Sequence, residues 1–406
     1  MLKGNIYLKG DKSISHRIVI FGSLANEKSK IYNLSNCSDV VHTIQILKDC
    51  GIKIKNDKDF LSVTGNTFTS KQKKFDCGNS GSTARFMLGL LPFKGLHGTL
   101  HGDDSLSKRP MLRVIEPLEK MGLKITNKTN NLPITFEPSI AKNIDYVLNK
   151  PSAQIKTAMI LASLNNTKES FIKDNYNTRD HTERIIKYLL NDISYKKQTI
   201  KSFQYHVPGD ISNAAFIIAA AILIKGSDII LKSVLYNSTR LGFIKVLCQM
   251  GADIKVLNKT EKQNEVVADI NVKFSPNLRG VKIDKSIVVS MIDEIPIFAM
   301  VACFANGMTK VSGAQELRIK ESDRINSVVE NLKNCGADIN EFKDGFTILG
   351  NKKLYYTNIN NYNDHRIAMT FKILEIILKK RIIRTNQNLI STSFPEFYTI
   401  LGDSYV

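Results

Sequence analysis

The sequence contains no tryptophan, no C-x-x-C pair and no hydrophobic run long enough to cross a membrane. Its six cysteines are scattered, and a chain of 406 residues does not need disulfides to fold, so we expect reduced thiols. The longest apolar stretch, residues 214–224, predicts a buried helix rather than a membrane span. The first residues hold no apolar core of a secretory signal. These absences argue against a disulfide scaffold and a membrane protein, and they predict a cytoplasmic location.

The charge balance is strongly basic, with a net charge of +19. Three interpretations compete: contacts to nucleic acid, a cleft for polyanionic substrates, and a composition rich in lysine throughout. No motif interleaves aromatic and basic residues, and acids interrupt the basic segment RIKESDR (residues 318–324), which argues against nucleic acid. The arginines are more informative than the lysines, because several lie beside Ser, Asp or His in polar motifs.

Weak internal repeats run along the chain. Each has apolar residues at helical spacing, then a glycine, then a short extended run, and the clearest copies span residues 40–54, 111–125, 240–254 and 324–339. Residues 181–195 have Asn191 where the glycine would be, and residues 365–378 keep only the helix. The glycines expected to end their helices in the left-handed conformation are Gly51, Gly122, Gly251 and Gly336. Alternation with short β-rich runs predicts an α/β protein with mixed sheets.

Two further features bear on the organisation of the chain. A seam is expected near residues 207–210, where a new helix begins, although no linker rich in Pro, Gly or Ser divides the chain. The polar segment at residues 258–265 predicts an exposed loop.

Several polar motifs open predicted helices, where free N–H groups and the helix dipole favour anions. In GDKSISHR (residues 10–17), Ser13 is the expected N-cap, Lys12 precedes the helix and Arg17 lies about one turn inside. GNSGSTAR (residues 78–85) allows close approach of the backbone, but it is not a P-loop because no Gly-Lys-Ser/Thr follows. Capped helices with solvated charges remain the alternative explanation for both motifs.

Two further motifs could form hydrogen bonds with a substrate, one through a charged side chain and the other through uncharged side chains. Arg109 precedes Pro110, so we expect an extended segment from which its guanidinium could clamp a carboxylate or phosphate. PSAQIK (residues 151–156) offers uncharged hydrogen bonds from Ser152 and Gln154.

Three later motifs gather arginines near carboxylates: IDEIP (residues 292–296), RIKESDR and NDHR (residues 363–366). Such a set could hold anions while an acid or base moves a proton. An ion-paired helix start is the alternative for Asp323 and Asp364.

Nine motifs occur in the order in which one enzyme family has them: GDKSISHR, GNSGSTAR, LSKRPM, PSAQIKTA, TRDHTER, IDEIP, RIKESDR, YNDHRIAM and SFPEF. On these motifs the chain resembles the EPSP synthase (3-phosphoshikimate 1-carboxyvinyltransferase) family of enolpyruvyl transferases over nearly its full length. The resemblance implies an α/β fold of two similar globular halves, each of three βαβαββ units, in an inverse α/β barrel-like arrangement. Residues 11–208 would form the N-terminal half, on the shikimate 3-phosphate side. Residues 1–10 plus 209–406 would form the C-terminal half, with the phosphoenolpyruvate clamp and the acid/base residues.

The resemblance also implies roles for individual residues. Asp293 and Glu321, with Lys12, match the catalytic acid/base group. The residues that match contacts to shikimate 3-phosphate are Lys12, Ser13, Arg17, Ser152, Ala153, Gln154, Thr178, Arg179, Asp293 and Lys320. Those that match contacts to phosphoenolpyruvate are Lys12, Asn79, Gly81, Arg109, Gln154, Arg324 and Arg366. We expect no metal, no cofactor, no nucleic acid, no membrane and a monomeric state.

The implied reaction is an addition followed by an elimination, in aromatic amino acid and chorismate biosynthesis. The 5-hydroxyl of shikimate 3-phosphate attacks C2 of phosphoenolpyruvate while C3 is protonated, and phosphate then leaves. Both substrates are anions, so cations are needed to offset their repulsion. Because the matched residues come from both halves, we expect an open form that closes on shikimate 3-phosphate. Glyphosate competes with phosphoenolpyruvate in this family, so inhibition is also expected.

Three positions depart from the pattern of some family members. Thr392 stands where some have lysine, Ala153 replaces a serine, and Glu316 replaces an asparagine. A second enzymatic interpretation is the related UDP-N-acetylglucosamine enolpyruvyl transferase, which usually uses a cysteine on a mobile loop as its acid. Residues 105–109 stand in place of such a loop, and no cysteine lies nearby.

Overall fold

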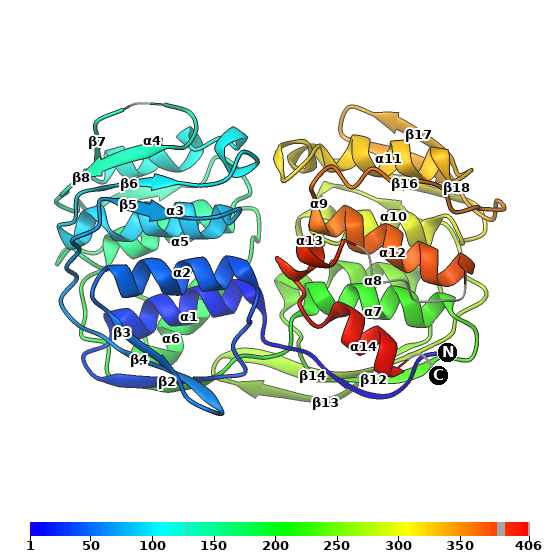
Figure 1. Ribbon diagram of the computed structural model, residues 1–406, viewed down its shortest axis with the longest axis horizontal. Coiled ribbons are helices and arrows are strands. Elements are labelled where there is room, and N and C mark those ends of the chain that lie inside the picture. Colours follow the sequence, from blue (N-terminus) through cyan, green and yellow to red (C-terminus); the bar gives the residue numbers. More distant parts are fainter. Residues whose placement is uncertain (128, 380–385, 405–406) are drawn as a thin grey trace. The chain divides into compact units, whose positions relative to one another are not determined.

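The computed structural model describes residues 1–127, 129–379 and 386–404. The chain divides into two compact units. Unit 1 consists of Met1–Lys9 and Pro208–Val406, and unit 2 is the continuous stretch Gly10–Val207 (Figure 1). Both units combine helices with small mixed sheets, which confirms the predicted α/β class.

Unit 2 has, among its described residues, two four-stranded sheets and one two-stranded sheet. Its strands are β2 (Lys28–Tyr32), β3 (Lys53–Asn56), β4 (Phe60–Thr64), β5 (Lys74–Asp76), β6 (Gly98–His101), β7 (Lys124–Ile125), β8 (Ile134–Glu137), β9 (Asp145–Val147), β10 (Phe171–Lys173) and β11 (Gln204–His206). Its α-helices are α1 (Lys12–Leu24), α2 (Ser38–Asp49), α3 (Gly81–Leu90), α4 (Leu112–Lys120), α5 (Ala153–Ser163) and α6 (His181–Leu190). The sheet orders are β11-β2-β4-β3 and β5-β6-β8-β7, in which only the first pair of each is parallel. The chain from β5 to β8 follows the predicted βαβαββ order.

Unit 1 repeats this sheet topology twice within the part of the chain that is described. Its strands are β1 (Lys3–Tyr7), β12 (Asp228–Leu235), β13 (Ile254–Lys262), β14 (Glu265–Lys273), β15 (Lys282–Ile283), β16 (Met308–Val311), β17 (Asp338–Phe342) and β18 (Gly345–Leu349). Its α-helices are α7 (Ile211–Leu223), α8 (Gly242–Gln249), α9 (Lys285–Val289), α10 (Ile295–Ala302), α11 (Arg324–Asn334), α12 (His365–Lys379), α13 (Gln387–Ser391) and α14 (Phe397–Ser404). The sheet orders are β1-β12-β14-β13 and β15-β16-β18-β17, and β1 lies parallel to β12.

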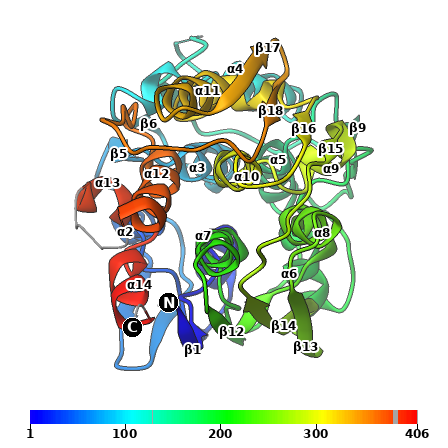
Figure 2. The same cartoon turned by 90° about the vertical axis from the view of Figure 1, so that its right-hand side faces the viewer.

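Buried helices form the centre of unit 1. Helices α7, α10 and α12 pack against one another. Figure 2 shows α7 near the middle of the view, with α10 above it and α12 to its left. Helix α7 is buried over nearly its whole length, which confirms the buried helix predicted from the apolar run at residues 214–224. Asp210 caps its start by accepting hydrogen bonds from the N–H groups of Ser212 and Asn213. No helix in the described ranges is long and apolar enough to span a membrane.

The predicted helix ends agree with the structure. The four repeat glycines have left-handed φ values: +83° at Gly51, +99° at Gly122, +94° at Gly251 and +89° at Gly336. Asn191 takes the same place after α6, with φ of +57°. Glycine and asparagine tolerate this conformation better than other residues. A glycine or asparagine after a helical pattern was therefore enough to predict where each helix ends.

Two local predictions were wrong. Asp11, rather than Ser13, caps α1, because its carboxylate accepts the N–H of Ile14, and the helix therefore begins two residues earlier, at Lys12. Residues 258–265 are not a loop, since most of them belong to β13 and the start of β14, and only Gln263 and Asn264 form the turn. The side chains of β13 are mostly exposed, which explains their polarity, while pairing with the largely buried β14 satisfies the backbone.

Candidate active site

The predicted site residues of unit 2 gather at the N-terminal ends of its helices. Lys12 and Ser13 open α1, and Gly81 is the first residue of α3. Ser152 caps α5, with Ala153 and Gln154 in the first turn. Thr178 and Arg179 lie shortly before α6. Free N–H groups at helix starts attract anions. Each of these motifs lies at a helix N-terminus, which therefore favours binding of an anionic substrate.

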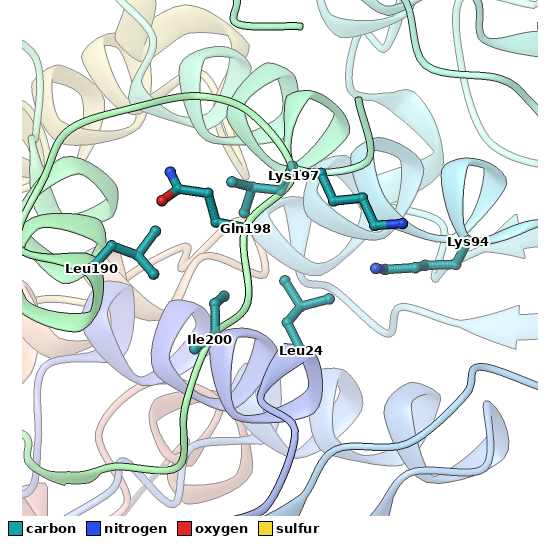
Figure 3. A pocket seen from close by; sticks show the side chains of 7 residues that line it. Leu24, Lys94, Leu190, Lys197, Gln198 and Ile200 are labelled. Carbon is teal, nitrogen blue, oxygen red and sulfur yellow. The ribbon is translucent and has the colours of Figure 1, made fainter. Parts of the chain in front are cut away.

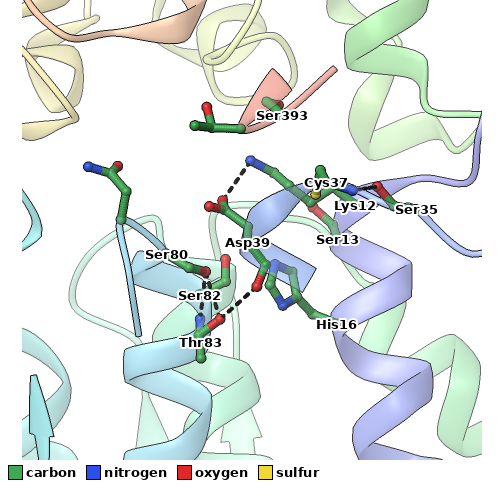
Figure 4. A network of polar contacts seen from close by, with 12 residues as sticks. Lys12, Ser13, His16, Ser35, Cys37, Asp39, Ser80, Ser82, Thr83 and Ser393 are labelled. Atoms are coloured by element: carbon green, nitrogen blue, oxygen red, sulfur yellow. Dashed lines mark hydrogen bonds and ion pairs between the residues drawn. The ribbon is translucent and has the colours of Figure 1, made fainter. Parts of the chain in front are cut away.

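Lys12 and Ser13 have partners from other parts of unit 2. The Lys12 Nζ lies 3.1 Å from the Asp39 Oδ2 (Figure 4). Arg179 Nη1 donates to Ser13 Oγ at 3.2 Å, which brings together two predicted contacts to shikimate 3-phosphate that lie 166 residues apart. His16, in the same motif, is fully buried and bonds Thr43, and burial lowers its pKa to about 3. It is therefore a neutral core residue.

Arg17 is buried and anchors three elements. Its Nε and Nη2 donate to the hydroxyls of Thr182 and Thr157, both at 2.8 Å, and its Nη1 donates to the Ser13 carbonyl at 2.7 Å. Its guanidinium also lies 4.8 Å from the centre of the Phe86 ring. Arg17 thus connects α1 with α5 and α6, and its direct contact with a substrate stays a prediction.

The predicted phosphoenolpyruvate residues of unit 2 form a second group. Arg109 has the extended conformation predicted for it, and its Nη2 donates to the Asn79 Oδ1 at 2.5 Å. A β-carbon added to Gly81 would lie 3.4 Å from Arg109 Nη1 and only 2.5 Å from Arg85 Nη1. Arg85, to which no role was assigned, donates to the Gln154 Oε1 at 2.9 Å. Glycine therefore leaves room for two guanidinium groups at the start of α3.

Unit 1 contains a buried cluster built around Arg324. Its Nε lies 2.8 Å from the Asp364 Oδ2, its Nη2 lies 2.7 Å from the Glu321 Oε2, and its Nη1 lies 3.3 Å from the Asp293 Oδ1. Arg366 Nη1 donates to the Asp293 carbonyl at 3.1 Å, and the Arg366 N–H donates to Asp364. The structure thus brings both predicted acid/base residues and both predicted clamp arginines of unit 1 together.

The charges of this cluster support one another. Burial disfavours the charge of Arg324, but Asp364, Glu321 and Asp293 outweigh it and raise the pKa of the guanidinium. Burial likewise disfavours the charge of Asp364, yet Arg324 holds the pKa of this carboxyl below its usual range. Asp364 is therefore an ionised partner that fixes the arginine, as the ion-pair alternative predicted for it.

A family model described as EPSP synthase (3-phosphoshikimate 1-carboxyvinyltransferase) matches residues 1–401. The chain belongs to this EPSP synthase family. A 3-phosphoshikimate 1-carboxyvinyltransferase of Persephonella marina is 41% identical, with 98% of this chain and 96% of the relative covered. The enzyme of that name from Aquifex aeolicus is 38% identical over the same shares. The family predicted from the nine motifs is confirmed.

Solved structures agree with the family assignment. The EPSP synthase of Acinetobacter baumannii has a TM-score of 0.86 at 34% identity, covering 99% of this chain and 96% of that one. The enolpyruvyl transferase NikO of Streptomyces tendae has a TM-score of 0.78 at 12% identity, covering 99% and 95% of the two chains, which supports the fold alone. The predicted enolpyruvyl transferase fold is therefore confirmed.

In this member of the EPSP synthase family, the two acids of IDEIP, Asp293 and Glu294, have different partners. Asp293 faces Arg324, whereas Glu294 is buried and accepts a hydrogen bond from Ser212, which in turn accepts one from Arg240 at 2.8 Å. The Ser212 and Arg240 partners lie far away in sequence, so no local signal could have distinguished the acids. Lys320 precedes Glu321 in the loop before α11, and its role stays a prediction.

A separate cavity of about 170 Å³ lies at the opposite ends of the unit 2 helices (Figure 3). Leu24 and Leu190 end α1 and α6, and Leu164 follows α5. The residues that line it are Leu24, Lys94, Leu164, Leu190, Lys197, Gln198 and Ile200, and no predicted site residue is among them. Burial and the neighbouring Lys197 lower the pKa of Lys94 to about 8.

Proposed function

We propose that this chain transfers the enolpyruvyl group of phosphoenolpyruvate to the 5-hydroxyl of shikimate 3-phosphate. In this proposal the predicted site residues of unit 2 and the Arg324 cluster of unit 1 act on these two substrates. The products are 5-enolpyruvylshikimate 3-phosphate and phosphate. Membership of the EPSP synthase family supports the reaction. The observation that supports the residue roles best is the meeting of Asp293, Glu321, Arg324 and Arg366 within unit 1.

The unit 1 cluster suits the proton transfers of the reaction. Asp293 accepts the proton of the 5-hydroxyl as the hydroxyl oxygen attacks C2 of phosphoenolpyruvate. Glu321, with Lys12, delivers a proton to C3. In the second step the Glu321 carboxylate takes a proton back from C3, and the C–O bond to phosphate breaks. The double bond is thereby restored and phosphate leaves. Arg324 contacts both carboxylates, so the two acids are electrostatically coupled. Arg324 and Arg366 hold the carboxylate of phosphoenolpyruvate in this proposal.

The unit 2 residues supply binding and charge compensation. Ser13, Arg17, Thr178 and Arg179 hold shikimate 3-phosphate together with the start of α5, including Ser152, Ala153 and Gln154. Lys320, a residue of unit 1, is assigned to the same substrate. Asn79, Gly81 and Arg109 bind phosphoenolpyruvate. Several cations are required because the two substrates repel each other. A monomeric state, a cytoplasmic location and the lack of a nucleic-acid partner belong to the same proposal, whereas small-molecule substrates follow from the family.

A phosphate-release assay with shikimate 3-phosphate and phosphoenolpyruvate tests the reaction. Release with this pair, and none when UDP-N-acetylglucosamine replaces shikimate 3-phosphate, is expected. Asp293→Asn and Glu321→Gln should each lower kcat by about 10²-fold or more, the usual range for a lost acid or base. Glu341→Gln is the matched control, since this carboxylate bonds Arg318 at 2.9 Å instead. Release with the nucleotide sugar alone would contradict the proposal.

A further inference from the structure

A buried lysine, Lys156, connects two segments of unit 2 that carry predicted substrate contacts. It lies in the first turns of α5, and its side chain is 4% exposed. Its Nζ lies 2.8 Å from the Asp174 Oδ2 and 2.7 Å from the Glu183 Oε1. Burial opposes the charge of this ammonium, but Glu183 and Asp174 outweigh it and raise the pKa of Lys156. The lysine therefore stays charged inside the unit.

Asp174 organises the turn that leads to the predicted phosphate contacts. Its Oδ1 accepts the Tyr176 N–H at 2.9 Å. Its Oδ2 accepts both the N–H of Thr178, at 3.1 Å, and the Thr178 hydroxyl, at 2.6 Å. Asn177, inside this turn, has a left-handed φ of +51°, a conformation that asparagine tolerates better than most residues. One carboxylate thus determines the path of the backbone into Thr178 and Arg179.

Glu183 holds the other side of the same segment. It belongs to the first turn of α6, which begins two residues after Arg179. Its Oε2 is buried and has no hydrogen-bond partner among the described residues, and burial raises the pKa of this carboxyl. Lys156, Asp174 and Glu183 together carry one positive and two acidic groups. A buried group with more acidic than basic side chains contributes little to the stability of the fold. This imbalance indicates that the three residues have a role other than stabilising the unit.

We infer that Lys156, Asp174 and Glu183 form a positioning triad for the turn that ends at Thr178–Arg179. The triad holds this turn in register with the start of α5 and so sets the affinity for shikimate 3-phosphate. Arg179 donates to Ser13 as well, so a shift of the turn would also change the contact with α1. The inference rests on the proposed function, because it takes these residues as contacts to that substrate.

Asp174→Asn is the sharpest test. A carboxylate has two acceptor oxygens, and here one receives Tyr176 and the other Thr178. An amide has only one acceptor, so one side of the turn must lose its bond. The change also leaves Lys156 and Glu183 as a neutral pair, so no unpaired charge is created. We expect the dissociation constant for shikimate 3-phosphate, measured by calorimetry without phosphoenolpyruvate, to rise about tenfold or more, as misplaced contact groups do.

Kinetics separate positioning from general damage. The KM for shikimate 3-phosphate should rise in parallel with the dissociation constant, while the KM for phosphoenolpyruvate changes less than about twofold. Lys156→Met should show the same split, and Lys156→Arg should restore part of the affinity because it keeps the charge. Lys94→Met, a lysine of the same unit in the separate cavity, is the control expected to leave both KM values unchanged.

The outcomes distinguish the two proposals. A wild-type chain that binds no shikimate 3-phosphate and releases no phosphate would contradict the proposed function. A wild type that does both, beside a folded Asp174→Asn variant with unchanged affinity, would overturn the triad alone. Folding of each variant is checked by its thermal unfolding transition, and Asp174→Asn keeps the test decisive if Lys156→Met does not fold.

Discussion

Arg109 is the residue whose proposed role can be isolated most cleanly. It bonds Asn79 and follows a short 3₁₀ turn, η2 (Leu106–Lys108). The residues proposed to contact shikimate 3-phosphate lie at other helices. Arg109→Ala should raise the KM for phosphoenolpyruvate by about tenfold or more, consistent with a lost charge-assisted hydrogen bond of ~1.5–3 kcal/mol. Affinity for shikimate 3-phosphate, measured by calorimetry, should change less than about twofold. Lys108→Ala is the neighbouring exposed control, and equal losses for both substrates would contradict the assignment.

The lack of a side chain at Gly81 predicts that glyphosate inhibits this enzyme. A methyl group there would meet Arg85 Nη1 at 2.5 Å and Arg109 Nη1 at 3.4 Å, so at least the first guanidinium must move. Wild-type activity should fall with glyphosate in competition with phosphoenolpyruvate. Gly81→Ala should raise the inhibition constant by a larger factor than it raises the KM for phosphoenolpyruvate. Steady-state kinetics at varied phosphoenolpyruvate measure both, and an uninhibited wild type would refute this expectation.

Asp364 links the Arg324 cluster to acid stability. Because the pKa of this carboxyl is lowered in the folded chain, its contribution is present above the unfolded value of about 3.9 and is lost as the pH falls through the folded value. Urea unfolding at pH 7 and pH 3 should therefore show a smaller acid-dependent loss for Asp364→Asn than for wild type, by about 1 kcal/mol. Asp338→Asn, an exposed aspartate of the same unit, should behave as wild type.

At the level of elements, the helix C-caps allow backbone strain to be separated from packing. An added β-carbon at Gly251 would meet only the Asn277 carbonyl, at 3.7 Å, whereas at Gly122 it would meet the Ile140 carbonyl at 2.4 Å. Gly251→Ala should thus lose about 1–2 kcal/mol of unfolding free energy, the cost of left-handed backbone for an L-residue. Gly122→Ala should lose more, and Gly251→Asn less. Denaturant titrations decide the order, and equal losses at both glycines would show that packing is irrelevant there.

The same elements show which features a sequence reveals. The glycines at helix ends and Asn191 were predictable because a left-handed cap is a property of a few consecutive residues. Asp293 and Glu294 are neighbours with the same chemistry, and only the distant partners Arg324 and Ser212 separate their roles. The β13–β14 hairpin was missed because its outer strand is polar, a pattern that loops share. Site residues were identified through family motifs, while their partners, such as Asp174, emerged only from the fold.

At the level of the whole molecule, the two units differ in how the chain builds them. Unit 2 is continuous, and its two ends meet, since a β-carbon added to Gly10 would lie 2.6 Å from Val207 Cγ1. The last strand, β11, pairs with β2. Unit 1 needs the first nine residues, because β1 pairs with β12 and because Leu2, Ile6 and Leu8 of this segment are buried. Each unit contains its own apolar core, so the requirements for folding can be tested separately.

A fragment of residues 10–207 should fold alone with a single cooperative transition, because it includes all strands and helices of unit 2. A fragment of residues 208–406 should be less stable than the same unit in the full chain, since the edge of β12 that pairs with β1 would be unpaired and apolar surface exposed. Adding a peptide of residues 1–9 should raise its melting temperature in a concentration-dependent way, as binding to the folded form requires. A peptide with Ile6→Asp should not, because Ile6 is buried in the unit. If the fragment of residues 208–406 melts at the same temperature with and without the native peptide, β1 does not have the structural role that its pairing with β12 implies.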